Sequence, residues 1–408
     1  MKTTKITFLA LLLLFGGVQS LCAQGRQEDG LPDRNKQLCT THEAMEVYYE
    51  ANPQAKAEHE ALEKFTQQYA QAHPVTDNLG KPTAAKYRIP VVFHVYGGAT
   101  HTFWGKTVTK AIVVGALADL NKDFQGLNDD YGTVNSTFAS VKSTLDISFE
   151  FALKKPDGTA TDGIDWKTTT GAGYGNGSGY DSKIAADAWD NTKYMNIYIV
   201  ADLYNDGQST NSGVCWYPDV SMTTAKTARL VYNGQYLGNN TTKEFRSVFT
   251  HEVGHFLNLA HTFDTGCSGT GDGVSDTPLH NSTSLGCPTS QTSKTPTSDC
   301  GNWQVNAENY MDYNGAFDCQ KMFTKGQVTR MIAALELNNN TRRPLWQQSN
   351  LISTGIFTTG INSDDDFANS IRVYPNPSNG IFQLEMMLNN QGNSKIEVID
   401  LLGCKLDH

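Results

Sequence analysis

The residues best suited to chemistry in this sequence lie in one short segment that contains three histidines and a glutamate. From residue 251 to residue 261 the segment reads HEVGHFLNLAH. On a helix, His251 and His255 project in nearly the same direction one turn apart, so both imidazoles can reach one metal ion, and Glu252 lies beside them. This spacing alone also fits an amphipathic helix with solvated side chains. The third histidine, His261, favours a metal site.

The position of His261 requires a turn in the chain. The stretch TTKE at residues 241–244 has capping-box form and precedes apolar residues at helical spacing, so we expect a helix that begins near Thr242. If that helix continued unbroken, His261 would point about 240° away from His255. Asparagine adopts the left-handed conformation more readily than most residues, so we expect a turn at Asn258 that returns His261 to the ion.

Three histidine ligands that leave one coordination position open are typical of catalytic zinc. We therefore hypothesise that neutral imidazole nitrogens of His251, His255 and His261 hold zinc, which lowers the pKa of a bound water to about 7. Glu252 then acts as the general base, which takes a proton from this water and passes it to the leaving amine.

The N-terminus has the composition of a secretory signal peptide at residues 1–23. Lys2 and Lys5 precede an apolar run over residues 6–18, and we expect cleavage after Ala23. A lipoprotein anchor at the preceding cysteine is the alternative. No later segment has the roughly 18 apolar residues that a membrane helix needs. The formal net charge of −10 argues against nucleic acid and anionic membranes as partners.

Four of the eight cysteines fall in one loop-rich stretch, at Cys267, Cys287, Cys300 and Cys319. Disulfides persist outside the cytosol, so export favours two bridges among these residues. Four cysteines allow three pairings, and the spacing does not choose among them. A second zinc site is the alternative, although the stretch contains no CxxC pair.

A chain of 408 residues is too long for one core with ordinary loops, so we expect a large domain with smaller appendages. Residues 24–87 are polar and helix-prone, and a change of character near Arg88 marks the start of the main domain, over 88–348. A Ser/Thr/Gly-rich linker over 349–369 and a small β module over 370–408 follow.

Hydrophobic patterns place several elements in the main domain. Alternating strands and helices predict an α/β or α+β fold. Strands are expected at 89–95, 145–153, 195–201 and 229–232, and a helix is expected at 110–124.

The metal-binding segment resembles the motif HExxHxxGxxH of the metzincin metalloproteases, with Asn258 in place of the glycine. In metzincins a methionine-containing turn follows, and ENYMDY at residues 308–313 looks like it. The resemblance implies that Met311 forms an apolar floor beneath the metal and that Tyr313 helps to stabilise the tetrahedral intermediate. It also implies a metzincin-like α/β (α+β) domain with a twisted mixed sheet and an active-site helix.

Within the metzincins the chain is most similar to the pappalysin family, over roughly residues 88–345. The stretches that carry this similarity are HTF at 261–263, GDGVSDTP at 271–278 and NYMDY at 309–313. The resemblance implies a calcium loop whose ligands map to Asp272, the main-chain carbonyl of Ser275, and Thr277. Oxygen ligands suit calcium, but a solvated Asp/Gly-rich turn is the alternative.

The family's cysteine pattern implies the disulfides Cys267–Cys300 and Cys287–Cys319. Family members often prefer Arg or Lys just after the scissile bond, through an aspartate two residues before the last of these cysteines. This sequence has Phe317 at that position, followed by Asp318. The resemblance therefore does not predict a cleavage preference.

Residues 24–87 resemble the pappalysin propeptide, in which a cysteine thiolate occupies the fourth position of zinc until cleavage. Cys39 is the matching residue, and a thiolate there would displace the catalytic water. A disulfide between Cys39 and Cys215, or an idle thiol, is the alternative. Maturation is expected in the exposed linker between Lys81 and Arg88.

The C-terminal region, from YPNP at 374–377 to Leu402 and Gly403, is similar to the sorting module of bacterial type IX secretion. The resemblance implies that this secretion machinery of Gram-negative bacteria is a partner. The module normally continues for another strand or two beyond the point where this sequence stops, at His408.

The sequence thus predicts a secreted zinc metalloendopeptidase that acts on proteins or peptides and is made as a latent zymogen. The strand at 229–232 is expected to bind extended substrate by edge pairing. One alternative is a non-catalytic surface or adhesion protein stabilised by calcium and zinc on the same fold. Another is a zinc-dependent hydrolase of a non-peptide ester or glycan.

Overall fold

A computed structural model describes most of the chain between residues 39 and 357, together with two short C-terminal strands. The described residues are 39, 41–73, 85–242, 245–281, 286–313, 319–357, 371–374 and 383–386. The signal peptide expected at 1–23 lies outside these residues, as do Lys81, Phe317, Asp318 and residues 387–408 of the expected β module.

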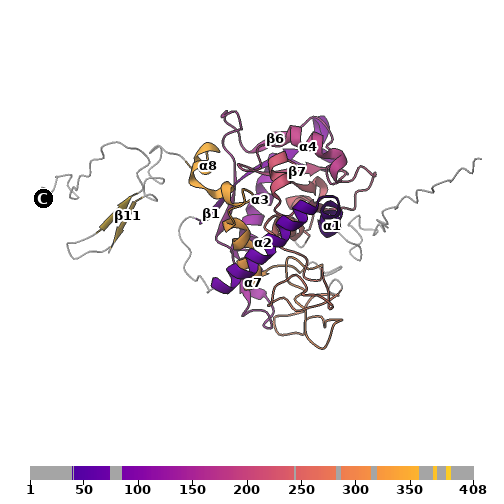
Figure 1. Cartoon of the computed structure of the whole chain (residues 1–408). Helices are drawn as coiled ribbons and strands as arrows, with labels where there is room; N and C mark the ends of the chain where they lie inside the picture. Colours follow the sequence, from indigo (N-terminus) through magenta and orange to yellow (C-terminus); the bar gives the residue numbers. More distant parts are fainter. Residues whose placement is uncertain are drawn as a thin grey trace, which may run out of the picture.

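A mixed sheet forms the centre of the main domain (Figure 1). Its strand order is β5-β1-β7-β9-β8, and β6 also pairs with β1. The strands β5, β6, β1, β7 and β9 run parallel to their neighbours, whereas β8 is antiparallel to β9. The bounds are β1 Tyr87–Val95, β5 Ile147–Phe151, β6 Ile164–Trp166, β7 Met195–Val200, β8 Gly213–Cys215 and β9 Leu230–Asn233. The expected mixed α/β architecture is therefore confirmed.

Both faces of the sheet are covered, because alternate residues of its strands enter two different cores. Ile197 and Ile199 of β7 pack into the core that contains the helices α3 (Lys110–Gln125) and α6 (Ser247–Phe256). Tyr198 and Val200 enter the core on the opposite face, with Ile184 of α4 (Asp181–Asp187) and Met222 of α5 (Val220–Ala225). This arrangement explains why β1 and β7 are nearly continuous hydrophobic runs, as is usual for parallel strands buried on both sides.

The main domain extends further towards the C-terminus than the expected boundary at residue 348. After α7 (Lys325–Glu336) and the short helix η6 (Arg343–Trp346), the helix α8 (Gln348–Ser353) begins where the linker was expected. Leu351 is buried, and the carbonyl oxygen of Thr354 accepts hydrogen bonds from the backbone N–H groups of Leu153 and Lys154. Residues up to 357 therefore belong to the domain. The expected boundary was too early because the Ser/Thr-rich composition of this segment does not indicate a packed helix.

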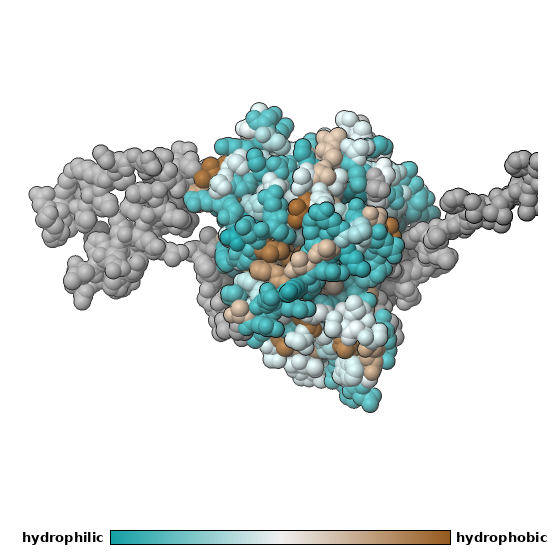
Figure 2. All heavy atoms as spheres, viewed as in Figure 1, coloured by the Kyte–Doolittle hydropathy of each residue, from teal (hydrophilic) through white to brown (hydrophobic). Residues whose placement is uncertain are grey.

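Two helices from the region before the main domain lie against it. These are α1 (Thr41–Ala51) and α2 (Pro53–Ala72), and Pro53 occupies the first turn of α2, where its missing N–H costs no hydrogen bond. The helix α2 contacts α7 and runs across the face of the molecule seen in Figure 1. That face is mostly hydrophilic (Figure 2), so α2 exposes its polar side to solvent.

The C-terminal strands β11 (Ile371–Tyr374) and β12 (Gln383–Met386) form an antiparallel pair within the segment where the small β module was expected. The remaining elements are short. They are η1 Gly98–Thr100, β2 Thr102–Phe103, β3 Lys106–Thr107, η2 Tyr131–Thr133, β4 Lys142–Ser143, η3 Ser178–Tyr180, η4 Gly234–Tyr236, η5 Gly238–Asn240 and β10 Phe323–Thr324.

Candidate metal centre

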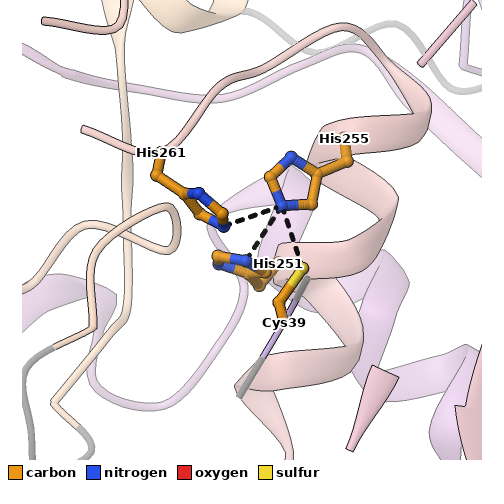
Figure 3. Close-up of side chains that lie close together, drawn as sticks. All are labelled: Cys39, His251, His255 and His261. Carbon is orange, nitrogen blue, oxygen red and sulfur yellow. Dashed lines mark hydrogen bonds between the residues drawn. The ribbon is translucent and has the colours of Figure 1, made fainter. Parts of the chain in front are cut away.

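Three imidazoles converge at the C-terminal half of α6. The Nε2 atom of His255 lies 3.0 Å from Nε2 of His251 and 3.2 Å from Nε2 of His261. Figure 3 shows the three rings with these nitrogens turned towards one another. All three side chains are buried. The structure thus brings together the three histidines that the sequence spacing singled out.

The turn after α6 lies at Asn258, as expected, but the helix begins later than expected. It starts at Ser247 rather than near Thr242. The Thr242 hydroxyl instead accepts a hydrogen bond from the backbone N–H of Phe245 at 3.2 Å, so Thr242 stabilises a turn that precedes the helix. At the other end, Asn258 has a φ of 71°, which is the left-handed conformation that reverses the chain.

Two arginines from later in the chain hold this reversal. The Nε atom of Arg342 donates to the carbonyl oxygen of Phe256 at 2.7 Å, and Nε of Arg330 donates to the carbonyl oxygen of Asn258 at 2.6 Å. The last carbonyl groups of a helix have no partner within the helix, and these guanidinium groups supply hydrogen-bond donors there. Their positive charge also interacts favourably with the negative end of the helix dipole. Sequence reasoning did not find either arginine, because no local pattern connects them to α6.

The outer nitrogen of each imidazole is hydrogen-bonded to an oxygen acceptor. The Nδ1 atoms of His251, His255 and His261 lie 2.7 Å from the carbonyl oxygens of Tyr310 and Leu259 and from Oδ1 of Asp264, respectively. Because these oxygens can only accept, each Nδ1 carries the proton and each Nε2 presents a lone pair to the centre. The sequence analysis did not identify Asp264. An acidic residue three positions after a histidine ligand could have indicated a hydrogen-bond partner for that histidine.

Electrostatics favour neutral imidazoles at this centre. Burial, followed by the neighbouring His261, lowers the pKa of His251 to about 3. Burial and the two other rings lower the pKa of His255 well below its ordinary value. For Asp264, burial alone would raise the pKa, but His261 outweighs it and the pKa lies below its usual range. Three neutral nitrogen donors this close to one another fit zinc, whereas calcium prefers oxygen ligands.

Glu252 lies next to the imidazoles and is completely buried. Burial raises the pKa of its carboxyl group to about 8. Its Oε1 atom has no hydrogen-bond partner among the described residues, so one lone-pair site remains for a small polar molecule. The neighbouring Gly213 of β8 leaves room for the Glu252 carboxylate, because a Cβ atom at residue 213 would lie 2.6 Å from Oε1 of Glu252.

Met311 lies against α6, and Tyr313 lies beside His261. Met311 is fully buried beneath α6, where a Cβ atom on Gly254 would lie 2.4 Å from its sulfur. The hydroxyl of Tyr313 lies 3.0 Å from Nε2 of His261. Burial raises the pKa of Tyr313 well above its ordinary value, so the hydroxyl keeps its proton and can donate it in a hydrogen bond.

Cys39 occupies the fourth side of the histidine cluster (Figure 3). Its sulfur lies 3.4 Å from Nε2 of His255 and 3.4 Å from Oε2 of Glu252. Burial, followed by the charge of Glu252, raises the pKa of the Cys39 thiol. A thiolate here therefore needs a cation beside it. The alternative disulfide between Cys39 and Cys215 is wrong, since both cysteines are free.

The backbone of Cys39 is also held in place. Its N–H donates to the Tyr313 hydroxyl at 3.1 Å, which in turn donates to the Cys39 carbonyl oxygen at 3.0 Å. Cys39 forms a parallel bridge with Gly213 of β8. The expectation that residues 229–232 form the substrate-binding edge is therefore wrong. Those residues lie largely in β9, which is paired on both sides, and β8 is the edge strand.

The loop at residues 271–278 buries a carboxylate. One oxygen of Asp272 accepts from the N–H of Val274 at 3.1 Å and from the Thr277 hydroxyl at 2.5 Å. The other oxygen, Oδ2, is buried without a hydrogen-bond partner among the described residues, and burial raises the pKa of Asp272 to about 7. An orphaned carboxylate oxygen beside a hydroxyl fits a hard cation such as calcium. Ser275 lies in the same loop and is exposed.

The four cysteines of the loop-rich stretch are joined as Cys267–Cys300 and Cys287–Cys319, with Cα–Cα distances of 5.4 and 6.0 Å. The pairing is the one that the pappalysin resemblance implied. A second zinc site on these cysteines is excluded, because each sulfur is bonded to another sulfur.

Comparison with known proteins agrees with this geometry. Residues 178–336 match the peptidase family model M43, described as pregnancy-associated plasma protein-A. An extracellular metalloprotease of Neurospora crassa is 40% identical over 149 residues, which are 34% of this chain and 47% of the relative. Extracellular metalloprotease 1 of Coccidioides posadasii is 36% identical over 143 residues, again 34% of this chain and 48% of the relative. The chain thus spans about half the length of the curated relatives it matches.

Solved structures of mirolysin from Tannerella forsythia are similar over more of the chain. A promirolysin mutant matches with a TM-score of 0.61 and 26% identity, covering 78% of this chain and 99% of that one. Mature mirolysin in complex with a cleaved peptide matches with a TM-score of 0.55 and 29% identity, covering 67% of this chain and 99% of that one. These matches do not favour the alternative of a non-catalytic adhesion protein. Within the described residues, no helix is long and apolar enough to cross a membrane.

Proposed function

We propose that this protein is a secreted, zinc-dependent metalloendopeptidase that is made as a latent zymogen. The proposal depends on one observation, the convergence of three Nε2 lone pairs next to the buried carboxylate of Glu252. His251, His255 and His261 would hold the ion. Zinc in such a site supplies a Lewis acid, which activates a water and polarises a carbonyl group.

Glu252 is the general base of the proposed reaction. Its carboxylate takes a proton from the attacking water and passes it to the leaving amine. A cation beside it favours the ionised form, which opposes the effect of burial on its pKa. The Tyr313 hydroxyl, which now binds the carbonyl oxygen of Cys39, would donate to the oxyanion once Cys39 has left. The edge strand β8 would pair with extended substrate, because Cys39 already pairs there.

Latency would come from residues 24–87, with Cys39 as the fourth ligand. Two features support this proposal. Cys39 lies within ligand reach of all three histidines, and the similarity to the promirolysin mutant covers more of this chain than the similarity to mature mirolysin. For maturation we favour cleavage at Lys81, because Lys86 directly precedes β1 and its Nζ atom lies 2.8 Å from Oε1 of Glu336. Arg88 lies in β1 and forms two 2.7 Å hydrogen bonds with Glu150, so a protease would have to break the sheet to reach it.

The remaining parts of the proposal concern stability and export. Asp272, Thr277 and the carbonyl of Ser275 would hold a structural calcium ion. Residues 1–23 would direct export, in line with the extracellular relatives, and residues 370–408 would act as a type IX sorting module. Substrates would be proteins or peptides.

Replacing Glu252 by alanine tests the proposed chemistry. We expect the zinc content to stay unchanged while hydrolysis of casein by the matured protein falls about 10²- to 10⁴-fold, the usual contribution of a general base. Asp157→Asn, which alters an exposed carboxylate in a turn, is the control and should retain full activity. Surviving hydrolysis in Glu252→Ala would refute the mechanism, and activity on esters or glycans but not on peptides would refute the substrate class.

A further inference from the structure

The helix α2 contacts the catalytic domain at the turn that follows the metal-binding helix. Oε1 of Glu63 accepts a hydrogen bond from Nδ2 of Asn258 at 3.0 Å and another from the guanidinium group of Arg330. The same guanidinium group donates through Nε to the backbone carbonyl of Asn258. Glu63 therefore binds two groups that already belong to one hydrogen-bonded unit, which reduces the conformational freedom lost when it docks.

An aromatic stack lies one helical turn away on the same side of α2. The His59 ring lies 5.7 Å from the ring of Tyr217 at an interplanar angle of 13°, and the Tyr49 ring of α1 stacks on the other face of His59 at 5.1 Å. Tyr217 also packs edge-on against His255, at 5.6 Å. The surface that receives α2 thus adjoins the histidine cluster without including it.

The docking contacts are shielded from water to an extent that strengthens them. The side chain of Arg330 is 8% exposed and that of Glu63 is 27% exposed. Leu62, which precedes Glu63, and Thr66, which lies about one helical turn after it, are buried. A charge-assisted hydrogen bond in such a place is stronger than an exposed ion pair.

Asn258 has a second role here that glycine could not fill. Glycine would adopt its φ of 71° more easily, but it has no side chain with which to bind Glu63. The departure from the metzincin motif therefore coincides with a contact to α2.

We propose that Tyr217, Asn258 and Arg330 form a docking site for the His59–Glu63 turn of α2, and that this site holds the propeptide on the catalytic domain independently of Cys39 and of the metal. The inference depends on the proposed function only in treating residues 24–87 as a propeptide. The docking site binds two side chains of α2 that lie one helical turn apart, the carboxylate of Glu63 and the ring of His59. None of the contacts that carry it involves a histidine of the cluster.

Amide hydrogen exchange of α2 in the full-length, metal-free chain tests this site. All proteins would carry Glu252→Ala, so that no peptidase activity can remove α2, and a chelator would exclude any contribution of a metal–thiolate bond. We expect Glu63→Ala to accelerate exchange of residues 53–72 about tenfold, because a charge-assisted bond is lost. Glu60→Ala is the matched control on the exposed face of the same helix and should change exchange by less than about twofold.

Asn258→Gly keeps the turn but removes the donor, so it should accelerate exchange of α2 as Glu63→Ala does. Cys39→Ser should have a smaller effect than Glu63→Ala. Exchange of β1 and β7 reports whether a variant still folds, and if Glu63→Ala disturbs those strands, Asn258→Gly decides alone. The proposal is overturned if both variants leave α2 exchange within about twofold of the parent, or if Cys39→Ser has the larger effect. Since this readout requires neither zinc nor catalysis, its failure would leave the test of Glu252 standing.

Discussion

The metal centre has two sides that are built in different ways. On one side, α6 and the turn at Met311 are part of the main core, to which they contribute Val253, Phe256 and Met311. On the other side, Cys39 lies against the histidines, and α1 and α2 contact the domain in several ways: Met45 of α1 packs into the core on the opposite face of the sheet, Glu63 accepts a hydrogen bond from Asn258, and His59 stacks on Tyr217. The difference indicates that the first side is built to remain and the second to leave, because the main core around α6 contains no residue of α1 or α2 and would stay intact without them.

The largest effect is expected from breaking the permanent side at a ligand. His261→Ala should abolish stoichiometric zinc binding and reduce peptide hydrolysis more than about 100-fold, since even loss of an outer-shell partner can cost that much. Zinc per chain and casein hydrolysis would measure both effects. Asp157→Asn, which alters an exposed carboxylate of the main domain, is again the control. Full zinc occupancy in His261→Ala would contradict the assignment.

The next largest effect is expected from packing beneath α6. Gly254→Ala places a Cβ atom 2.4 Å from the Met311 sulfur, and overpacking of this kind costs about 1–3 kcal/mol of unfolding free energy. Gly115→Ala, in the helix α3, has no heavy atom within 4 Å of the new Cβ and should stabilise the protein by about 0.5–1 kcal/mol. Denaturant unfolding of the two variants compares them directly, and an equal effect on both would show that the Met311 contact is unimportant.

A smaller effect, in the opposite direction, is expected from loosening the removable side. Cys39→Ala should raise the peptidase activity of the uncleaved chain at least about tenfold, because the fourth metal position becomes available in a larger fraction of molecules. Cys215→Ala removes the second buried free thiol of the described residues and should leave latency unchanged. If Cys39→Ala and the parent were equally latent, Cys39 would not be the switch.

The smallest effect concerns pH and the docking of α2. Burial lowers the pKa of His59, with Arg330 acting in the same direction and Glu63 and Glu60 opposing. A histidine held neutral in the fold contributes stability above its ordinary pKa of about 6.5, and this contribution is lost as the pH falls below that value. Burial would raise the pKa of Glu63, but Arg330 outweighs it, so the contribution of Glu63 is lost only at still lower pH. Exchange of α2, corrected for intrinsic rates, should therefore accelerate a few-fold from pH 7 to pH 5, and His59→Gln should remove this dependence.

Local sequence patterns were sufficient for much of this description. The strands β1 and β7 and the helix α3 lie within two residues of their expected limits, because buried parallel strands and amphipathic helices have clear periodicity. The approach of His261 to His255 also follows from spacing and from one residue that tolerates a positive φ.

What could not be predicted depends on contacts between distant residues. Nothing local shows that Gly213 must lack a side chain so that Glu252 fits, or that β8 rather than β9 forms the sheet edge. Pairing between strands is a tertiary property, and the short β8 has too few residues for a periodic pattern. The same reason explains why the contact between Glu63 and Asn258 was not found.

The supports of the Asn258 turn have a consequence for the order of events during synthesis. The guanidinium groups that hold Phe256 and Asn258 come from residues 86 and 72 positions further along the chain. A nascent chain that ends just after His261 therefore lacks the two arginines, Arg330 and Arg342, that hold the turn between the metal ligands. The metal site is therefore expected to reach its final geometry only late in synthesis, once Arg342 has joined the chain.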